Sequence, residues 1–230
     1  MFALRREAKP FRRRCGHTRE RIEIRTPCPT WAYSCGGKKF LVLVTGIGAE
    51  RAADAARWVW DHFRPRLLVA CGFAGALSPK LQVGDVLLAS EVVEADEDDM
   101  HWRTAVPTEL GDLPVGRLVT VPELVGRPSG KRTLARQTAA VAVDMESAAI
   151  AEVCQEKQMP CAVVRVISDT ADTALSDRLV DLMSGGRVSP LRVLAAVVRS
   201  PWLLVELWRL ARDTRIAARE LAGALSKLLR

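Results

Sequence analysis

The sequence lacks the patterns that mark membrane-spanning and secreted proteins. No apolar run approaches the roughly 18 residues that a spanning helix needs, and the longest candidate covers only residues 67–77. Charged residues fill the N-terminus, MFALRREAKPFRRR, where a secretion signal would carry its apolar segment. The six cysteines form no CxxC pair, which argues against a disulfide framework. These absences together predict a cytoplasmic protein.

Aromatic residues are also scarce, at 5% of the 230-residue chain, and this bears on the net charge of +7. The basic side chains concentrate between Arg5 and Arg25 and again from Arg187 onward. Such charge can attract nucleic acid or phosphate, but no nucleic-acid motif accompanies it, and few rings are present on which bases could stack. We therefore expect a solvated basic surface and no nucleic-acid partner.

The sequence shows no recognisable metal site. Cys15, His17, Cys28 and Cys35 lie near one another, but their C-x-H and C-x6-C spacings match no common structural zinc site. We interpret this region as a loop with incidental thiols, and we expect neither a metal nor a cofactor.

What the sequence does contain is an alternation of strand and helix patterns. Apolar, strand-like runs cover residues 40–48, 67–77, 85–93, 117–121 and 161–169. Apolar residues recur at helical spacing in two segments, residues 49–63 and the stretch that follows VDM. This order indicates an α/β fold with a mostly parallel sheet covered on both faces, in which ligands bind beyond the carboxyl ends of the strands. Residues 94–116 are charged and aperiodic, which predicts a long loop near the site.

The last 45 residues of the chain change character. We predict one domain over residues 1–185 and a basic, amphipathic helical tail over residues 186–230, packed on the domain or extending from it. Ser200–Pro201 is a good N-cap and first-turn pair for this tail. Trp202 and Trp208 stand among arginines, a pattern that would also suit peripheral contact with a membrane.

Two glycine-containing motifs lie toward the ends of strand-like runs. TGIG at 45–48 fails the GxGxxG dinucleotide pattern, because Arg51 stands at the third glycine, although a phosphate or sugar turn remains open. CGFAG at 71–75 puts small residues at the end of a buried strand, where the backbone can approach a ligand. A tight structural turn would explain the second motif equally well.

Three acidic residues stand at the expected ends of strands. Asp144 and Glu146 belong to VDMES, before a helix, and Asp169 ends the run VVRVISD. Glu7 follows a short apolar stub. Helix capping would explain Asp144, Ser147 or Asp169 singly, and a surface ion pair would explain Glu7, but their joint placement indicates a site.

Four motifs carry a resemblance to a known family. GIG at 46–48, CGFAGALSPKLQVGDVLLAS at 71–90, AVDMESAAIAEVC at 142–154 and VVRVISDTAD at 163–172 resemble the purine nucleoside phosphorylase superfamily, and within it the methylthioadenosine/S-adenosylhomocysteine nucleosidases. The motifs occur in the family's order. The resemblance implies a three-layer α/β/α fold around a central mixed, mostly parallel sheet, a small nucleoside substrate and a homodimer.

The resemblance also implies roles for Glu7, Glu146 and Asp169. Glu7 ends an A-x-x-x-E pattern and would activate the attacking water. Met145 and Glu146 match the pair that holds the ribose. Asp169, with Ser168 beside it, matches the acid that protonates N7 of the leaving adenine.

Four further positions are expected to contact the substrate. Gly72 and Phe73 lie in the motif CGFAG, and Leu124 and Val125 fall near the family's base-packing positions. Phosphorylases of the hexameric type carry a phosphate-binding arginine and serine where this chain has Ala70 and Phe73, so we expect hydrolysis. Phe73 also departs from the serine common in the nucleosidases. Phosphorolysis, with phosphate as co-substrate, remains the alternative.

Three other possibilities stay open. The basic, leucine-rich C-terminus resembles that of hopanoid-associated phosphorylases, which act on an adenosylated lipid. A relative without activity could bind a nucleoside or dock on membranes. In the family, the first strand lies several residues before the A-x-x-x-E pattern, whereas in this chain only Met1 and Phe2 come before it. Either the sequence begins downstream of that strand, or the sheet lacks most of the strand.

Overall fold

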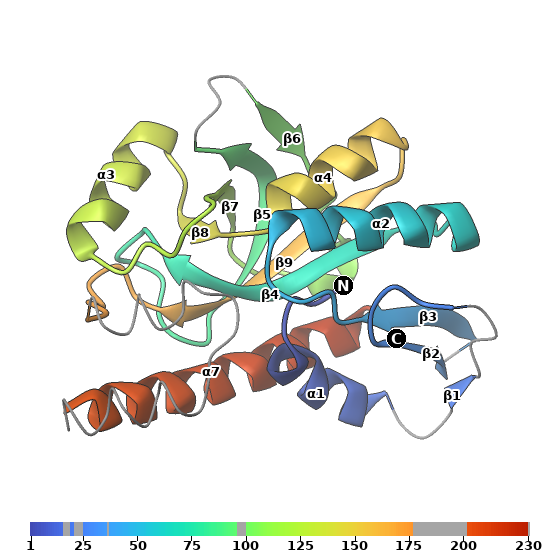
Figure 1. The fold of residues 1–230 in the computed structure, drawn as a ribbon, viewed down its shortest axis with the longest axis horizontal. Coiled ribbons are helices and arrows are strands. Elements are labelled where there is room, and N and C mark those ends of the chain that lie inside the picture. The colour runs from blue at the N-terminus through green and yellow to red at the C-terminus, as the bar shows by residue number, and fades with distance from the viewer. Residues whose placement is uncertain (16–18, 21–24, 36, 96–99, 177–201, 230) are drawn as a thin grey trace.

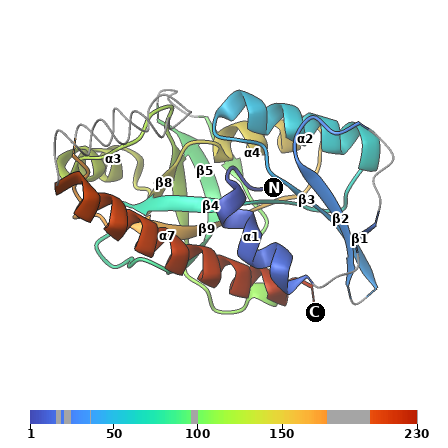
Figure 2. The same ribbon diagram turned by 60° about the horizontal axis from the view of Figure 1, so that its bottom comes forward.

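The chain folds into three layers, with helices on both faces of a β-sheet (Figure 1). The computed structural model describes residues 1–15, 19–20, 25–35, 37–95, 100–176 and 202–229. One face carries α2 (Ala49–Phe63) and α4 (Ser147–Glu156). The other carries α1 (Arg5–Arg14) and α7 (Trp202–Lys227), which lie against each other (Figure 2). The predicted three-layer α/β/α fold is confirmed.

The central sheet is mixed and closes on itself. Its strands are β4 (Leu68–Ala76), β5 (Val86–Glu94), β6 (His101–Arg103), β7 (Val115–Thr120), β8 (Ala142–Asp144) and β9 (Cys161–Asp169). They are ordered β6-β5-β7-β8-β4-β9, and β5 pairs with β7 in parallel and with β9 antiparallel. We call β5, β7, β8, β4 and β9 the closed ring. Both edges of β5 are therefore paired within it.

The first three residues join a second sheet to this ring. β1 (Arg19–Glu20), β2 (Thr30–Cys35) and β3 (Lys38–Leu43) form an antiparallel sheet of their own. Phe2 makes parallel bridges to Val44 beyond β3 and to Cys71 in β4, and the Met1 amino group donates to the Val69 carbonyl oxygen at 2.6 Å. The short segment before Glu7 thus lies between β3 and β4 and leads directly into α1.

Small side chains let α2 approach the sheet closely. Its buried residues are four alanines and one valine, and they pack with α4 and one face of the ring. On the other face, α7 packs against α1, β9 and β4, with Leu221 fully buried. The C-terminal tail is a single long helix over the described part of its length. Its Ser200–Pro201 cap and the predicted boundary at residue 185 lie outside the described residues.

Several elements differ from the sequence-based expectation. The segment predicted to be a long loop contains β6 and the 3-10 turn η1 (Thr108–Leu110). In β6, Trp102 is buried between exposed neighbours, but a strand of three residues is too short to show periodicity in the sequence. Cys35 lies in β2, not in a loop. The helix α3 (Pro128–Thr138) was not predicted, since its buried residues are only Lys131 and Leu134.

The described residues contain neither a helix that could span a membrane nor a cluster of metal ligands. None of the helices described here is long and apolar enough to cross a membrane. Within the same ranges, no three His, Cys, Asp or Glu side chains are grouped to hold a metal ion, and the six cysteines are free thiols. His17 lies outside the described residues.

Candidate active site

Three of the predicted acids, Glu7, Asp144 and Glu146, gather around a buried arginine, Arg165, in the middle of β9. Its guanidinium forms an ion pair with Asp144 at the end of β8, and Nη2 donates to Ser147 Oγ at 2.8 Å. Burial opposes the positive charge, but the carboxylates of Asp144, Glu146 and Glu7 outweigh this effect and raise the pKa of Arg165. Arg165 is therefore a fixed cation that organises the acids around it.

Asp144 serves the start of α4 as well as the ion pair. Its carboxylate accepts the backbone N–H of Ser147 at 3.1 Å and the hydroxyl of Thr120, at the end of β7, at 2.7 Å. The capping role expected of either Asp144 or Ser147 thus falls to the side chain of Asp144. This one carboxylate therefore links the ends of β7 and β8 to the middle of β9.

Glu7 lies in the first turn of α1 and is almost fully buried. Oε2 accepts the N–H of Leu4 at 2.8 Å, and Oε1 accepts the N–H of Phe73 at 3.1 Å. Burial raises the pKa of Glu7, against the opposing effects of these N–H groups and of Arg165. A Cβ atom at Gly72 would clash with Nη1 of Arg165 and would lie 3.2 Å from Oε1 of Glu7. Glycine at this position is what lets the two side chains meet over β4.

Glu146 is held by the TGIG turn. Its Oε1 accepts the N–H of Gly48 at 3.2 Å, and Gly46 and Gly48 have φ values of +90° and +117°, which favour glycine. The TGIG turn, which the sequence left open as a phosphate or sugar turn, therefore donates the N–H of Gly48 to the side chain of Glu146. Burial, and next the charge of Asp144, raise the pKa of Glu146 to about 7. Met145, the preceding residue, is half-buried.

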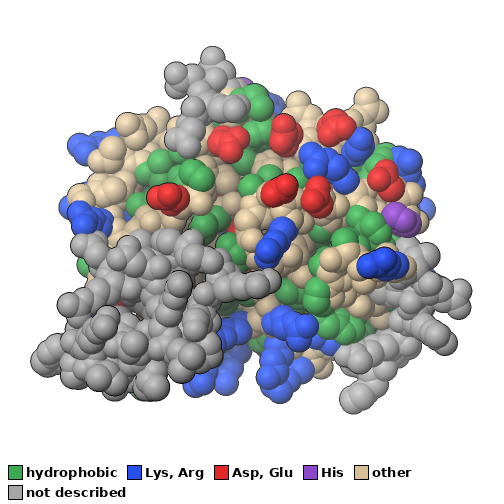
Figure 3. All heavy atoms as spheres, in the orientation of Figure 1, with side chains coloured by type: hydrophobic (Ala, Val, Ile, Leu, Met, Phe, Trp, Pro, Cys, Tyr) green, Lys and Arg blue, Asp and Glu red, His purple; other side chains and the backbone are tan. Residues whose placement is uncertain are grey.

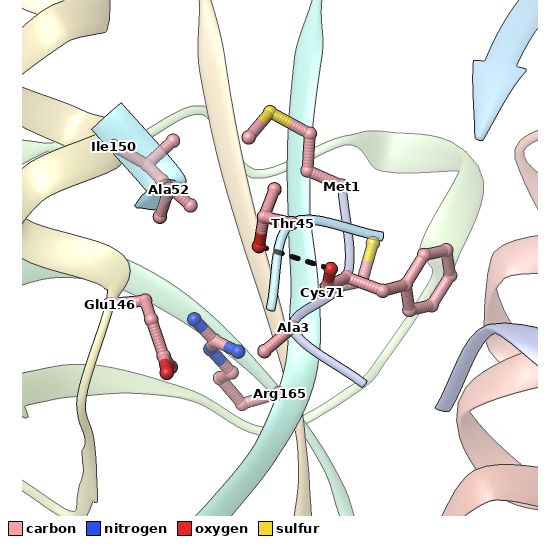
Figure 4. Close-up of a pocket in the computed structure, with 9 residues that line it drawn as sticks. Met1, Ala3, Thr45, Ala52, Cys71, Glu146, Ile150 and Arg165 are labelled. Carbon is pink, nitrogen blue, oxygen red and sulfur yellow. Dashed lines mark hydrogen bonds between the residues drawn. The ribbon is translucent and has the colours of Figure 1, made fainter. Parts of the chain in front are cut away.

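A small cavity separates the first residues of the chain from α2 and α4. Glu146 and Arg165 point toward each other at its edge, and Thr45, Met1 and Ala3 also line it (Figure 4). Its volume is about 10 Å³, which is close to what one water molecule requires. The cavity places room for a water beside the charged groups of the site.

Asp169 stands at the end of β9, where the pairing with β4 becomes irregular. The register shifts between Ala74 and Gly75, so that Gly75 lies opposite Asp169, and such irregularities redirect side chains. Oδ1 accepts the hydroxyl of Ser168 at 2.7 Å, and Oδ2 forms an ion pair with Lys131 of α3. Asp169 and Ser168 are therefore next to each other, as expected, but Lys131 was not anticipated.

Leu124 and Val125 lie in the connection from β7 to α3, at the same end of the sheet as Asp144 and Asp169. Both are half-buried, and Val125 packs against a cluster of apolar residues that includes Leu134. This connection supplies an apolar wall close to the strand ends.

Sequence reasoning missed Arg165 and Lys131 as members of the site. Arg165 had a usable signal, because an arginine inside the apolar run CAVVRVISD must be paired if the strand is buried. Lys131 had none, since it lies in a polar stretch whose helical pattern is weak.

Comparisons with known proteins agree with this architecture. The family model described as "Phosphorylase superfamily" matches residues 2–109 and 104–199. A curated relative, the 5′-methylthioadenosine/S-adenosylhomocysteine nucleosidase of Staphylococcus haemolyticus, is 30% identical over 164 residues, which cover 59% of this chain and 70% of the relative.

Solved structures show the same fold at lower identity. A futalosine hydrolase mutant of Helicobacter pylori superposes with a TM-score of 0.77 at 20% identity, covering 99% of this chain and 95% of the other. A mutant nucleosidase of the same organism, with 5′-methylthioadenosine in its active site, gives 0.76 at 21% identity over the same shares. The chain therefore belongs to the phosphorylase superfamily, as an enzyme of the nucleosidase-like or nucleoside phosphorylase kind that cleaves N-glycosidic bonds.

Proposed function

We propose that the protein hydrolyses the N-glycosidic bond of an adenine nucleoside that carries a substituent at its 5′ position, as methylthioadenosine does. The observation that carries this proposal is the charge around Arg165. Asp144 already pairs with this arginine, and Glu7 and Glu146 also face it. A phosphate co-substrate would bring further negative charge against these carboxylates, whereas an attacking water brings none.

Glu7 is the proposed base. Its raised pKa lets it take a proton from water near neutral pH more readily than an exposed glutamate could. Gly72 and the backbone of Phe73 keep this carboxylate beside Arg165, so both residues would shape the face from which water attacks. The relative from Staphylococcus haemolyticus, by its name a nucleosidase, supports the choice of hydrolysis.

The remaining residues divide between sugar and base. Glu146 would accept hydrogen bonds from ribose hydroxyls, with Met145 beside it packing on the sugar. Asp169, with Ser168, would protonate N7 of adenine, because the bond breaks more easily when the base leaves uncharged. The half-buried side chains of Leu124 and Val125 would pack on the adenine ring.

Incubation with methylthioadenosine, with and without phosphate, tests the proposal. We expect free adenine at the same rate in both, together with the free thiosugar, measured by chromatography. Strict dependence on phosphate, with a sugar 1-phosphate as product, would show a phosphorylase instead, the class to which the alternative that acts on an adenosylated lipid belongs. Binding of adenosine without turnover, measured by calorimetry, would show a non-catalytic relative.

We also propose a peripheral contact with anionic membranes through α1 and α7. These helices form one layer, and Nη1 of Arg14 lies across Gly223 of α7. Lys and Arg side chains gather where this layer reaches the lower edge of the molecule (Figure 3). The exposed side chains on α7 are mainly basic and apolar, and include Arg209, Arg212, Arg215 and Arg219 together with Val205, Trp208 and Ile216. The acidic Glu220 is also exposed, and Asp213 pairs with Arg212. Such a mixture suits an interface of anionic lipid headgroups.

Vesicle flotation tests this contact. We expect binding to phosphatidylcholine vesicles that contain phosphatidylglycerol, weakening at high salt, and little binding to phosphatidylcholine alone. The double charge reversal Arg209→Glu and Arg212→Glu should abolish it. Arg57→Glu, on α2 at the opposite face, is the matched control and should bind normally. Equal binding of both variants would contradict the proposal.

A homodimer and a cytoplasmic location complete the proposal. The carboxyl end of α2 offers apolar surface for a second copy, with Phe63 exposed and Trp58 and Trp60 half-buried. Light scattering should give twice the mass of the chain, and Phe63→Glu should shift it toward the monomer. A monomeric wild-type protein would contradict the dimer.

A further inference from the structure

Lys131 is a buried cation that the roles proposed above leave unused. It lies in the first turn of α3, with 1% of its side chain exposed. Its Nζ donates to Oδ2 of Asp169 and, at 2.7 Å, to the carbonyl oxygen of Thr170. A lysine is rarely buried to this extent, because desolvation of its charge is costly unless its partners are well placed.

Asp169 stands between Lys131 and any ligand of the site. Its side chain is 15% exposed, so a substrate can touch it, whereas Lys131 is covered. On the β4 side, Gly75 leaves space for the carboxylate, since a Cβ atom there would lie 3.0 Å from Oδ2. Lys131 can therefore act on a substrate only through Asp169.

The hydrogen bonds of this pair occupy both oxygens of Asp169. Asp169 accepts from Ser168 on Oδ1 and from Lys131 on Oδ2, and a carboxylate that accepts on both oxygens has no proton of its own to give. The ammonium group has one. We propose that Lys131 supplies, through Asp169, the proton that the departing adenine takes up. This inference rests on the proposed nucleosidase function and deepens it.

The step balances without a further reactant. The bond between the ribose C1′ and adenine N9 breaks, and its electron pair goes to the purine, while a proton passes from Lys131 to Asp169 and from Asp169 to N7. The water oxygen bonds to C1′ and gives its proton to Glu7. When the products leave, that proton returns by way of solvent to Lys131, which restores both residues.

The test compares Lys131→Met with the wild-type protein on two substrates. Adenine leaves methylthioadenosine with a proton, whereas nitrophenolate leaves 4-nitrophenyl β-D-ribofuranoside without one. We expect kcat on methylthioadenosine to fall about 10²–10⁴-fold with little change in KM, as it should in Asp169→Asn, and kcat on the nitrophenyl riboside to be retained. Lys157→Met, in a surface ion pair with Glu156, is the matched control and should keep both activities.

A second variant guards against misfolding of the first. Lys131→Arg keeps the charge and the ion pair, but a guanidinium does not release a proton in proteins. It should keep the melting temperature of the wild type and still lose adenine release. Full adenine release by either variant, or equal loss on both substrates, would overturn the inference. A wild-type protein that releases no adenine would instead overturn the proposed function.

Discussion

At the scale of single residues, Glu7 and Glu146 are two buried carboxylates whose surroundings suit them to different tasks. Glu7 accepts a backbone N–H on each oxygen, whereas Glu146 accepts one from Gly48 and faces the charge of Asp144. Burial raises the pKa of both. Each therefore exchanges protons closer to neutral pH than a solvated glutamate would.

Glu7→Gln should reduce kcat for adenine release about 10²–10⁴-fold, because an amide cannot take a proton from water. Its NH₂ group would also face one of the backbone N–H donors from Leu4 and Phe73, at a cost of about 1–3 kcal/mol in unfolding free energy. Steady-state kinetics and urea unfolding measure the two effects. Glu50→Gln, exposed in the first turn of α2, should change neither. Unchanged kcat in Glu7→Gln would remove this residue from the mechanism.

The free energy of unfolding should depend on pH through Glu146. Its pKa rises from 4.5 to about 7 on folding, so the folded chain keeps a proton that the unfolded chain releases in this range. The contribution is fully present below about pH 4.5 and is lost as the pH rises through about 7. At 1.36 kcal/mol per pKa unit it amounts to roughly 3 kcal/mol. Urea unfolding of the wild type should show this decline relative to Glu146→Gln; parallel profiles would contradict it.

At the scale of elements, the sequence predicted well what long apolar patterns can encode. The strand at 161–169 and the helix at 49–63 were predicted with the ends that the structure shows. The shorter α3 was missed, because a helix that turns a lysine inward carries no apolar stripe. The same limit applies to the site. The motifs predicted that acids lie at strand ends, but only the structure shows that Asp144 pairs with Arg165 and Asp169 with Lys131.

Gly72 of β4 has no room for a Cβ atom, because one there would clash with Nη1 of Arg165 on the neighbouring strand β9. Gly72→Ala would push Arg165 away from Asp144, at a cost of about 1–3 kcal/mol in stability, and the displaced cation should lower kcat about 10²-fold. Gly223→Ala is the matched control. Its Cβ would meet Arg14 at an ordinary 3.6 Å, and the change should stabilise α7 by about 1 kcal/mol. Thermal unfolding and kinetics of both variants test the difference, and a normal kcat in Gly72→Ala would be the contrary result.

At the scale of the whole molecule, the two ends of the sequence stabilise each other. The segment Met1–Phe2 is inserted beside β4, α1 follows it, and α7 covers α1 from outside. Lys38, the first residue of β3, donates to the carbonyl oxygen of Leu228 at 3.1 Å. Glu7 is thus held in place by residues from both termini, and the C-terminal helix supports the site without lining it.

Leu221→Ala tests whether α7 unfolds together with the rest of the chain. Leu221 is fully buried against the layer formed by α1 and the sheet. Its truncation should lower the free energy of global unfolding by about 2–5 kcal/mol. Val205→Ala, at an exposed position of the same helix, should stay within about 0.5 kcal/mol of the wild type. Circular dichroism and tryptophan fluorescence should report one shared transition; a separate early transition would show an independent tail.

The closed ring also sets the order in which a newly made chain can complete its fold. β5 leaves the ribosome well before β9, which must pair with its second edge. β6 pairs with residues 91–93 of that edge soon afterwards, but residues 86–89 remain without β9 for several seconds at about 5–20 residues per second. During this interval their backbone groups are open to strands of other nascent chains. Arg165 is synthesised as part of β9. A nascent chain on a crowded polysome is therefore most prone to associate with neighbouring chains before Arg165 can contact Glu7.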